Sequence, residues 1–301
     1  MSTLWGIDLG GTKIEGAILD PENSDRAVQR LRVPTGGDQG YEHILSQIEH
    51  LIVELESVSG TRRPSVLGIG TPGATEPATG TLKNSNTVCL NGRSLRDDLA
   101  ARLNIEIRLA NDANCFALAE ATLGAAKGAR VVMGLILGTG VGGGIVIDGR
   151  VLEGLHGIAG EWGHNPLSGE TTPCYCGQSG CVETVLAGPS LERFYREQTG
   201  ETVPLPEIVQ RAQVGDSQAE ATLIRLREKF GEALAVVLNI LDPEAIVIGG
   251  GVGNLDLLYE EKTREALLRH TFNREVRTRI LKPALGDSAG VFGAAMLTQG
   301  L

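Results

Sequence analysis

A histidine and three cysteines are grouped closely enough along the chain to hold one metal ion. His164 is followed by Cys174, Cys176 and Cys181 in the spacing His-x9-Cys-x-Cys-x4-Cys. One imidazole and three thiolates would complete a closed tetrahedral shell for zinc, with no open position for a water molecule. A closed shell indicates a structural ion. The alternative is a chance grouping of buried cysteines, which the short spacing among glycines disfavours.

Two aspartates stand where predicted strands end. Asp8 lies near the end of an apolar run over residues 4–9 and could hold the magnesium ion that accompanies nucleotide phosphates. The alternative for Asp8 is a residue that caps the turn. Asp112 follows a predicted strand over residues 106–109 and could take the proton from an acceptor hydroxyl during phosphoryl transfer. Its alternative is the N-cap of a helix, a position that aspartate favours.

Three glycine-rich segments could supply the main-chain N–H groups that phosphate oxygens require. Each closes an apolar run, and only glycine lets the backbone approach a phosphate closely. The P-loop spacing is absent, and the one Gly-x-Gly-x-x-Gly string is followed by a strand-like run instead of a helix. One such segment is weak evidence, but three together predict a nucleotide site. They are Gly10, Gly11, Thr12 and Lys13, then Gly138, Thr139 and Gly140, and last Gly249, Gly250 and Gly251.

The elements that position these residues follow from apolar periodicity. A strand, a glycine turn and a second strand occupy residues 4–19, and the same pattern returns over residues 131–148, 128 residues later when counted from Gly10 to Gly138. This repeat predicts two related α/β domains that offer glycine tips to a shared cleft. Further buried strands are predicted over residues 66–70 and 245–248, and helices over residues 41–57, 95–103, 113–126, 217–241, 255–270 and 288–297.

Composition bounds the class of protein. The 301 residues are 42% hydrophobic and 21% charged, which suits two globular domains. A formal net charge of −10 disfavours nucleic acid and anionic membranes as partners. Five cysteines, an odd number, suit a reducing compartment, and no leader or membrane segment is evident, so we expect a cytoplasmic protein. Cys89 and Cys115 are interpreted as small buried apolar residues.

Taken together, these residues resemble the ROK family of bacterial sugar kinases and sugar-responsive repressors. The resemblance covers nearly the whole chain and implies an actin-like fold, in which a ribonuclease H-like α/β domain is duplicated around a nucleotide and sugar cleft. It implies a smaller domain of residues 1–110 plus 288–301, and a larger domain of residues 111–287 with the zinc loop. The motifs that carry it are Gly6–Lys13, Asn111–Asn114, Leu137–Gly144, Glu161–His164, the cysteine group and Ile248–Gly251.

The resemblance also implies a division of roles. Asp112 would be the base that activates the 6-hydroxyl of a hexose. The first two glycine segments would bind the phosphates of ATP, and Asp8 would hold the accompanying Mg²⁺. The third glycine segment would lie under the adenosine. His164 would bind the one structural zinc through one ring nitrogen and face the sugar with the other. The residues implied to hold the other sugar hydroxyls are Asn86, Asn111, Glu161, His164 and Glu183.

The subgroup determines which sugar is expected. Leu90–Gly92, Gly163–Leu167 and Cys174–Gly177 are most similar to the fructokinases of the family, so D-fructose is the first expectation. Asn114–Leu118 and Val132–Gly144 are similar to its N-acetylglucosamine kinases, and Cys89 stands where the fructokinases have tryptophan. Glucose, mannose and N-acetylglucosamine therefore stay open as alternatives. The family analogy also implies a homodimer.

Two rivals belong to other functional classes. The first is a sugar-sensing repressor of the same family, which would carry a helix-turn-helix ahead of the first glycine turn. Nine residues precede Gly10 and the chain is acidic, so we expect no such reader of DNA. The second rival is a non-catalytic sugar-binding protein that keeps zinc for structure. The presence of Asp112 counts against it.

Overall fold

The structure is a computed structural model that describes residues 3–20 and 26–299. The chain divides into two compact units, and each is described by itself. The domain boundaries expected at residues 110/111 and 287/288 stay a prediction. The first unit comprises Met1–Gly128, Gly144–Ala159 and Pro283–Leu301, and the second comprises Ala129–Gly143 and Gly160–Lys282.

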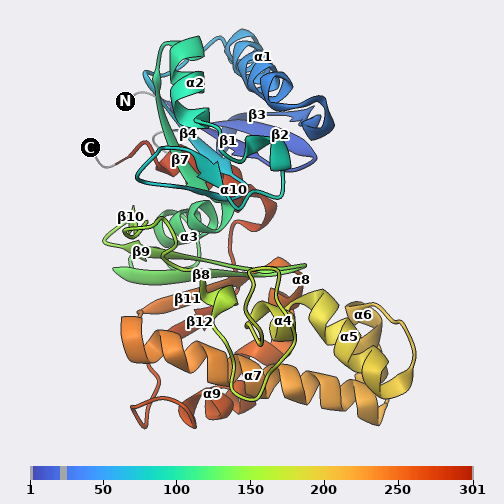
Figure 1. The fold of residues 1–301 in the computed structure, drawn as a ribbon. Helices are drawn as coiled ribbons and strands as arrows, with labels where there is room; N and C mark the ends of the chain where they lie inside the picture. The colour runs from blue at the N-terminus through green and yellow to red at the C-terminus, as the bar shows by residue number, and fades with distance from the viewer. Residues whose placement is uncertain (1–2, 21–25, 300–301) are drawn as a thin grey trace. The chain divides into compact units, whose positions relative to one another are not determined.

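The first unit is built on a five-stranded sheet with the strand order β3-β2-β1-β4-β7 (Figure 1). The first three strands form an antiparallel ribbon, and β4 and β7 continue from β1 in parallel. The predicted strands of this sheet are confirmed, whereas β3 was not predicted. The strands are β1 (Leu4–Leu9), β2 (Lys13–Leu19), β3 (Ala27–Pro34), β4 (Val66–Thr71) and β7 (Glu106–Asn111).

One face of this sheet carries the apolar core. Alternate residues of β1, Trp5, Ile7 and Leu9, are buried in the same core as the apolar residues of helices α1 (Tyr41–Ser59) and α2 (Leu95–Leu103). Helix α1 buries the apolar stripe that its periodicity predicts. Each large apolar side chain so buried contributes roughly 1.5–3 kcal/mol before the entropy of ordering is counted.

The opposite face of the sheet has glycines where a helix packs against it, so the main chain of that helix can lie close to the strands. Gly6 of β1 and Gly68 of β4 face helix α10 (Ala289–Met296), the helix predicted near the C-terminus. A Cβ atom on Gly68 would lie 1.7 Å from the carbonyl oxygen of Ala294, and one on Gly6 would lie 2.2 Å from that of Val291. The glycines therefore allow α10 to approach the strand ends closely.

Helix α3 (Asp112–Thr122) ends four residues before the predicted residue 126, and a side chain of the helix binds main chain beyond its end. The buried carboxylate of Glu120 accepts hydrogen bonds from the main-chain nitrogens of Ala125 at 2.8 Å, Ala284 at 3.1 Å and Leu285 at 2.9 Å. These nitrogens belong to the segments by which the chain leaves the first unit and returns to it. Glu120 thus fastens both segments to α3.

The second sheet has the strand order β10-β9-β8-β11-β12, which matches the first position by position. Strand β11 pairs in parallel with β8 and β12, and β10 pairs antiparallel with β9. The strand predicted to begin at Gly144 begins at Val141, and it carries the chain from the second unit to the first. The strands are β8 (Val131–Leu137), β9 (Val141–Ile147), β10 (Arg150–Val151), β11 (Ala245–Gly249) and β12 (Arg279–Leu281).

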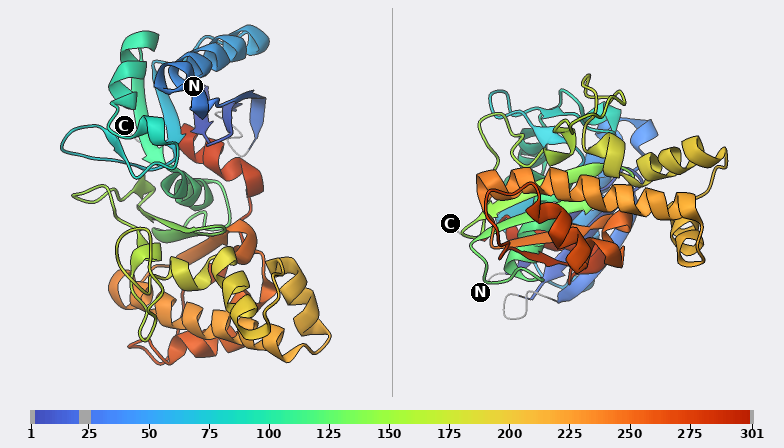
Figure 2. Two further views of the ribbon diagram at one scale, coloured as in Figure 1. Left: turned by 45° about the vertical axis from the view of Figure 1, so that its right-hand side comes forward. Right: turned by 90° about the horizontal axis from the view of Figure 1, so that it is seen from below.

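Helix α7 (Ser217–Leu241) is the longest element of the second unit, and its predicted bounds are confirmed (Figure 2). Asp216 caps its first turn by accepting from two main-chain nitrogens. The helix predicted over residues 255–270 is a short 3-10 turn followed by α9 (Glu261–Leu268). Within the described residues, the other elements are β5 (Ala74–Thr75), β6 (Leu82–Lys83), α4 (Glu183–Leu186), α5 (Gly188–Thr199), α6 (Leu205–Gln213), α8 (Gly250–Gly253) and four further 3-10 turns.

Within the part of the chain that the structure describes, none of the helices combines the length and the apolar character needed to span a bilayer.

Candidate functional site

The first glycine tip is a tight connection between β1 and β2. The main-chain N–H of Gly10 donates to the carbonyl oxygen of Lys13 at 3.0 Å, and the Thr35 hydroxyl donates to the carbonyl oxygen of Gly10 at 2.7 Å. Gly11 and Thr12 between them are exposed. The tip is therefore anchored at its base while its main chain stays open to a ligand, as a phosphate-binding turn requires.

Asp8 stands next to this tip in a crowded environment. Its carboxyl lies against the start of α10, where a Cβ atom on Gly290 would lie 2.8 Å from one carboxyl oxygen. Burial above all, and then the charges of Asp112 and Glu15, raise the pKa of Asp8 to about 6, while the charge of Lys13 acts in the opposite direction. A magnesium ion would reverse this effect, because it favours the ionised carboxylate.

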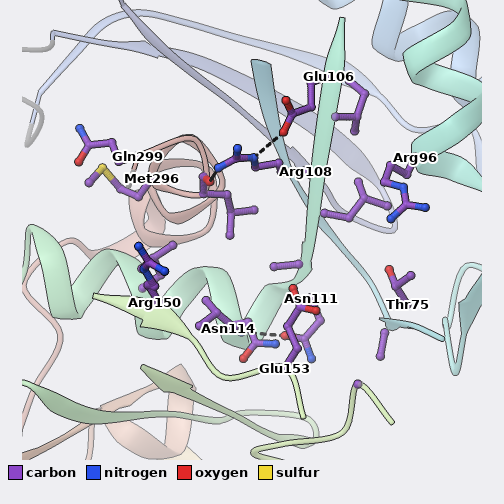
Figure 3. A pocket seen from close by; sticks show the side chains of 18 of the residues that line it. Thr75, Arg96, Glu106, Arg108, Asn111, Asn114, Arg150, Glu153, Met296 and Gln299 are labelled. Atoms are coloured by element: carbon purple, nitrogen blue, oxygen red, sulfur yellow. Dashed lines mark hydrogen bonds and ion pairs between the residues drawn. The ribbon is translucent and has the colours of Figure 1, made fainter. Parts of the chain in front are cut away.

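Asp112 is the first residue of α3 and not its cap. The side chain of Asn111 caps the helix by accepting from the main-chain nitrogen of Asn114 at 2.8 Å, as the dashed line between them shows (Figure 3). The residue Asp112 is exposed, but the protein around its carboxyl desolvates it and raises its pKa. A solvent-accessible carboxylate with a raised pKa is suited to accept a proton from a ligand.

Asn86 belongs to an exposed turn that a neighbouring amide holds in shape. The Asn91 side chain accepts from the Ser85 nitrogen at 2.8 Å and donates to the Ser85 carbonyl oxygen at 2.9 Å. Asn86 itself is exposed, so its amide is free to meet a ligand. Cys115 is buried as predicted, but the prediction for Cys89 was wrong. Cys89 is only half-buried, and its thiol donates to the carbonyl oxygen of Gly37 at 3.5 Å.

The cavity drawn in Figure 3 lies in the first unit beside Asn111 and Asn114 and has a volume of about 590 Å³. Arginine side chains line it, yet they are already engaged by the protein. Arg108 pairs with Glu106 at 2.9 Å and donates to the Leu297 carbonyl oxygen, also at 2.9 Å. The arginines of this cavity therefore do not by themselves indicate an anion-binding site.

The second and third glycine segments meet in the second unit. Gly250 has φ of +85°, and a Cβ atom there would lie 2.2 Å from the carbonyl oxygen of Leu137, which ends β8. The main-chain nitrogen of Gly188, which begins helix α5, donates to the carbonyl oxygen of Gly138 at 2.8 Å. Gly188 was missed, because one glycine before a helix carries no distinctive sequence signal.

The four predicted metal ligands come together in the second unit. The ligand atoms of His164, Cys174, Cys176 and Cys181 all lie within 4.8 Å of one another. His164 Nδ1 is 3.6 Å from the Cys174 sulfur, and the sulfurs of Cys176 and Cys181 are also 3.6 Å apart. In a tetrahedral zinc site these edges would measure about 3.6 Å and about 3.8 Å. The donor set therefore fits one zinc ion.

The loop that carries this Cys/His cluster is held by main chain and by charge. Gly180 has φ of +73°, and a Cβ atom there would lie 2.3 Å from the Glu170 carbonyl oxygen. The carboxylate of Glu170 binds the guanidinium of Arg225 on α7 through two bonds of 2.8 Å, and this pairing lowers the pKa of Glu170. The loop is thus tied to the long helix.

Two glutamates, Glu161 and Glu183, lie near His164 and Cys181 of the cluster in space or in sequence. Nε2 of His164 lies 4.0 Å from a carboxylate oxygen of Glu161, and Glu183 begins helix α4 two residues after Cys181. The Glu183 carboxylate accepts from the main-chain nitrogen of Val141 at 2.8 Å, directly after the second glycine tip. The zinc loop and the glycine tip are therefore connected through a single carboxylate.

Tyr175 is a further residue of this group that the sequence did not single out. Its hydroxyl oxygen is 3.1 Å from His164 Nε2. Partial burial of that hydroxyl, and then the negative charges of Glu183 and Glu161, raise the pKa of Tyr175 to about 12. Its position between two cysteines was the available signal, but a side chain between metal ligands is usually solvated.

Each unit thus gathers its own set of predicted residues. In the first unit Asp8, Asp112 and the first glycine tip lie at the carboxyl ends of strands of one sheet, where ligands bind in α/β proteins. In the second unit the other two glycine segments lie together, and Glu183 links one of them to the Cys/His cluster.

Comparison with known proteins identifies the family. The profile of the ROK family matches residues 4–300. The chain belongs to the ROK family. The two matching sheets, with the same strand order around paired hairpins, are the duplicated actin-like fold expected from the sequence.

Among its relatives, an N-acetyl-D-glucosamine kinase from Escherichia coli O157:H7 is 38% identical over 304 residues, covering 97% of this chain and 98% of the relative. A ROK hexokinase from Thermus thermophilus is 34% identical with a TM-score of 0.87, covering 98% of this chain and 97% of that one. A ROK glucokinase from Streptomyces griseus, solved with glucose and AMPPNP, is 28% identical with a TM-score of 0.77, covering 99% and 100%.

Proposed function

We propose that this protein is an ATP-dependent sugar kinase that phosphorylates the 6-hydroxyl of a hexose. The observation that carries the proposal is the position of Asp112. It directly follows strand β7, its helix-capping role is taken by Asn111, and its pKa is raised. ROK relatives of similar length that are kinases for N-acetyl-D-glucosamine and hexose support the same reaction.

In this proposal Asp112 accepts the proton of the 6-hydroxyl as its oxygen attacks the γ-phosphorus of ATP. A base of this strength suffices, because bond formation is late in phosphoryl transfer and the proton becomes acidic only near the transition state. The exposed main chain of Gly11 and Thr12 and the side chain of Lys13 would bind the phosphates. Asp8 would hold Mg²⁺, which supplies charge neutralisation on the phosphate oxygens.

The second unit carries further residues with proposed roles in ligand binding. Gly138–Gly140 would bind phosphate, and Gly249–Gly251 would lie under the adenosine. Glu161, His164 and Glu183 would bind sugar hydroxyls, a role that the resemblance also gives to Asn86 and Asn111 of the first unit. Zinc bound to the Cys/His cluster would be structural, since four protein ligands leave no position for water or substrate.

We place N-acetyl-D-glucosamine first among the sugars, ahead of the fructose that parts of the sequence favour. Several bacterial N-acetyl-D-glucosamine kinases match at 35–38% identity over 97% of the chain. D-Fructose stays the second candidate, because the segment Gly163–Leu167 beside the Cys/His cluster is similar to fructokinases. The homodimer implied by the family also stays a prediction, which analytical ultracentrifugation would test.

A coupled assay of ADP release tests the proposal directly. The purified protein with Mg²⁺ and ATP is offered N-acetyl-D-glucosamine, D-fructose, glucose, mannose and N-acetyl-D-mannosamine in turn. We expect sugar-dependent ADP release, with the highest kcat/KM for N-acetyl-D-glucosamine, and a product phosphorylated at carbon 6 by NMR. A protein that binds one of these sugars but releases no ADP with any of them would be a non-catalytic sugar-binding protein.

A further inference from the structure

Thr87 is a buried residue of the first unit whose hydroxyl group is not used by the fold. It directly follows Asn86, and its exposed fraction is only 9%. Its main chain is well satisfied, because its nitrogen donates to the Ser85 hydroxyl at 3.1 Å and its carbonyl oxygen accepts from the Leu90 nitrogen at 3.0 Å. Among the described residues, however, the structure shows no hydrogen bond of Thr87 Oγ1, which does not cap the 3-10 turn that follows it. Buried hydroxyl groups are normally paired, so this one requires an explanation.

The two branches of the Thr87 side chain face different neighbours. A Cβ atom on Gly37 would lie 3.3 Å from the Thr87 methyl carbon, Cγ2, so the methyl group is turned toward Gly37. A Cβ atom on Gly11 would lie 3.9 Å from Thr87 Oγ1, so the hydroxyl is turned toward the first glycine tip. The turn is also held beside Gly37 by Cys89, whose thiol donates to the Gly37 carbonyl oxygen at 3.5 Å.

The space that the hydroxyl shares with the tip is open to a ligand. Apart from Thr87 Oγ1 and the chain neighbours of Gly11, no atom of the described chain lies within 4 Å of a Cβ position on Gly11. The unpartnered polar side-chain atoms that are sealed from solvent in this part of the chain belong to Arg30, His43, Asn114 and Arg227, and Thr87 Oγ1 is not one of them. The hydroxyl can therefore still donate a hydrogen bond to a group that arrives at the exposed tip.

We propose that Thr87 is a further residue of the phosphoryl-transfer site, and that its hydroxyl donates to an oxygen of the γ-phosphoryl group of ATP. This inference rests on the proposed function, which gives the tip a phosphate and gives Asn86 a sugar hydroxyl. Thr87 joins the turn that carries Asn86 to the tip that carries Gly11. The γ-phosphoryl group is the part of ATP that must lie between the nucleotide and the attacking sugar oxygen. A donor at this junction therefore meets that group before the other phosphates.

The test compares Thr87→Val, which keeps the shape of the side chain and removes the hydroxyl, with the wild-type protein. Calorimetric titration in the presence of Mg²⁺ uses AMPPNP, which has a γ-phosphoryl group, and ADP, which has none. Loss of a hydrogen bond to a charged oxygen weakens binding by roughly 10- to 100-fold. We expect Kd for AMPPNP to rise by that factor and kcat/KM for ATP to fall at least as much. Kd for ADP and KM for the sugar should stay within about twofold.

Two further variants separate this contact from a structural role. Thr87→Ser keeps the hydroxyl and should bind AMPPNP with a Kd within about threefold of the wild type. Thr79→Val makes the same exchange at an exposed position of the first unit, where the hydroxyl lies 2.7 Å from that of Thr81, and should leave every constant unchanged. Urea denaturation of Thr87→Val should show no loss of stability, because its hydroxyl has no partner in the protein to lose.

Three results would overturn the assignment of Thr87. They are an unchanged Kd for AMPPNP in Thr87→Val, an equal rise for AMPPNP and ADP, and a rise confined to KM for the sugar. Calorimetry also separates this inference from the proposed function. A wild-type protein that binds AMPPNP but phosphorylates no sugar would refute the kinase, and the two nucleotide affinities would still decide the contact of Thr87. A wild-type protein that binds no nucleotide would refute both.

Discussion

The two glycine hairpins share a scaffold but differ in the charge they carry. In the first hairpin Asp8 and Glu15 are partners across β1 and β2, and buried Glu15 is paired with Arg30, with Arg32 at 2.7 Å and with Lys13 at 3.8 Å. In the second hairpin, 128 residues later, Ile136, Val141 and Gly143 stand in place of Asp8, Lys13 and Glu15.

This difference shows how one fold can assign separate tasks to its two copies. The first hairpin carries its own charged side chains, which we propose act on a phosphate and a metal ion. The second hairpin offers main-chain N–H groups and obtains its one carboxylate, Glu183, from outside the repeat. Because Glu183 lies two residues after Cys181, we expect the second hairpin, and not the first, to depend on the loop that carries the Cys/His cluster.

Loss of zinc should produce the largest effect and should separate the two hairpins. In Cys176→Ser the apparent free energy of unfolding should fall by roughly 3 kcal/mol or more, because metal binding contributes to folding. Hydrogen exchange should accelerate at the amide of Val141, which the Glu183 carboxylate holds, while the Gly10 amide, which is bound to Lys13, should be unaffected.

Cys89→Ser controls for the change of a thiol to a hydroxyl, since Cys89 lies in the first unit outside the Cys/His cluster. It should leave the zinc content at about one ion per chain and both amides protected. Purified wild-type protein that holds no zinc, or equal deprotection of both amides in Cys176→Ser, would contradict the dependence of the second hairpin on zinc.

Gly250→Ala should have the next largest effect, again on the second hairpin. The backbone at Gly250 is left-handed, with φ of +85°, which alanine adopts poorly. The new methyl group would also lie 2.2 Å from the carbonyl oxygen of Leu137. Such strain costs about 3 kcal/mol and should weaken nucleotide binding, because Leu137 leads into Gly138–Gly140. Chemical denaturation and titration with a non-hydrolysable ATP analogue measure the two effects.

Gly251→Ala is the control one residue away. Among the described residues, no atom outside its chain neighbours and its own helix turn lies within 4 Å of the position of its new methyl group, and its backbone is not left-handed. We expect its stability to remain within about 0.5 kcal/mol of the wild type. If the two variants lose stability equally, the contact between the second and third glycine segments does not determine the local structure.

Asp8→Asn should have the smallest effect, and it should depend on pH. Burial raises the pKa of Asp8 to about 6, so the folded protein holds this proton more tightly than the unfolded chain, and the ionised side chain opposes folding as the pH rises from about 4 to about 6. Asparagine removes that penalty. Without ligands, the variant should be more stable than the wild type by about 1–2 kcal/mol at pH 8, allowing for partial solvent screening.

The gain in Asp8→Asn should shrink as the pH falls toward 4 and vanish below it, because the wild-type carboxyl becomes neutral in both states only below its pKa in the unfolded chain. Urea denaturation between pH 4 and pH 8 measures it, with the exposed residue Asp38 changed to Asn as the control. A difference in stability that does not change with pH would show that Asp8 is not desolvated. The same variant should bind Mg²⁺–nucleotide more weakly than the wild type.

Much of the fold could be predicted because apolar runs and periodic apolar residues mark many of the helices and strands clearly. The stripe of α1 and the apolar runs of β1, β4, β8 and β11 fixed those elements to within a few residues. Strand β3 was missed because Arg30 and Arg32 are typical of an exposed segment. In the structure both arginines pair with buried Glu15 of the neighbouring strand. Such pairing is a tertiary effect that one-strand patterns do not contain.

The candidate site was less completely predictable for the same reason. The Cys/His cluster follows from spacing alone, since only four side chains of suitable chemistry are needed. The sequence alone could not distinguish a general base from a helix N-cap at Asp112. In the structure Asn111 is the N-cap. Gly188 and Tyr175 were not found, because their roles come from contacts with Gly138 and His164 that are 50 and 11 residues away in sequence.

The most direct test of the account is the turnover of Asp112→Asn with the sugar that the wild-type protein prefers. We expect the variant to fold, to keep its zinc and to bind the sugar with nearly unchanged Kd, while kcat falls by roughly 10²–10⁴-fold, the contribution of a positioned general base. Turnover within a few-fold of the wild type, at unchanged sugar affinity, would contradict the central claim that Asp112 accepts the proton of the attacking hydroxyl.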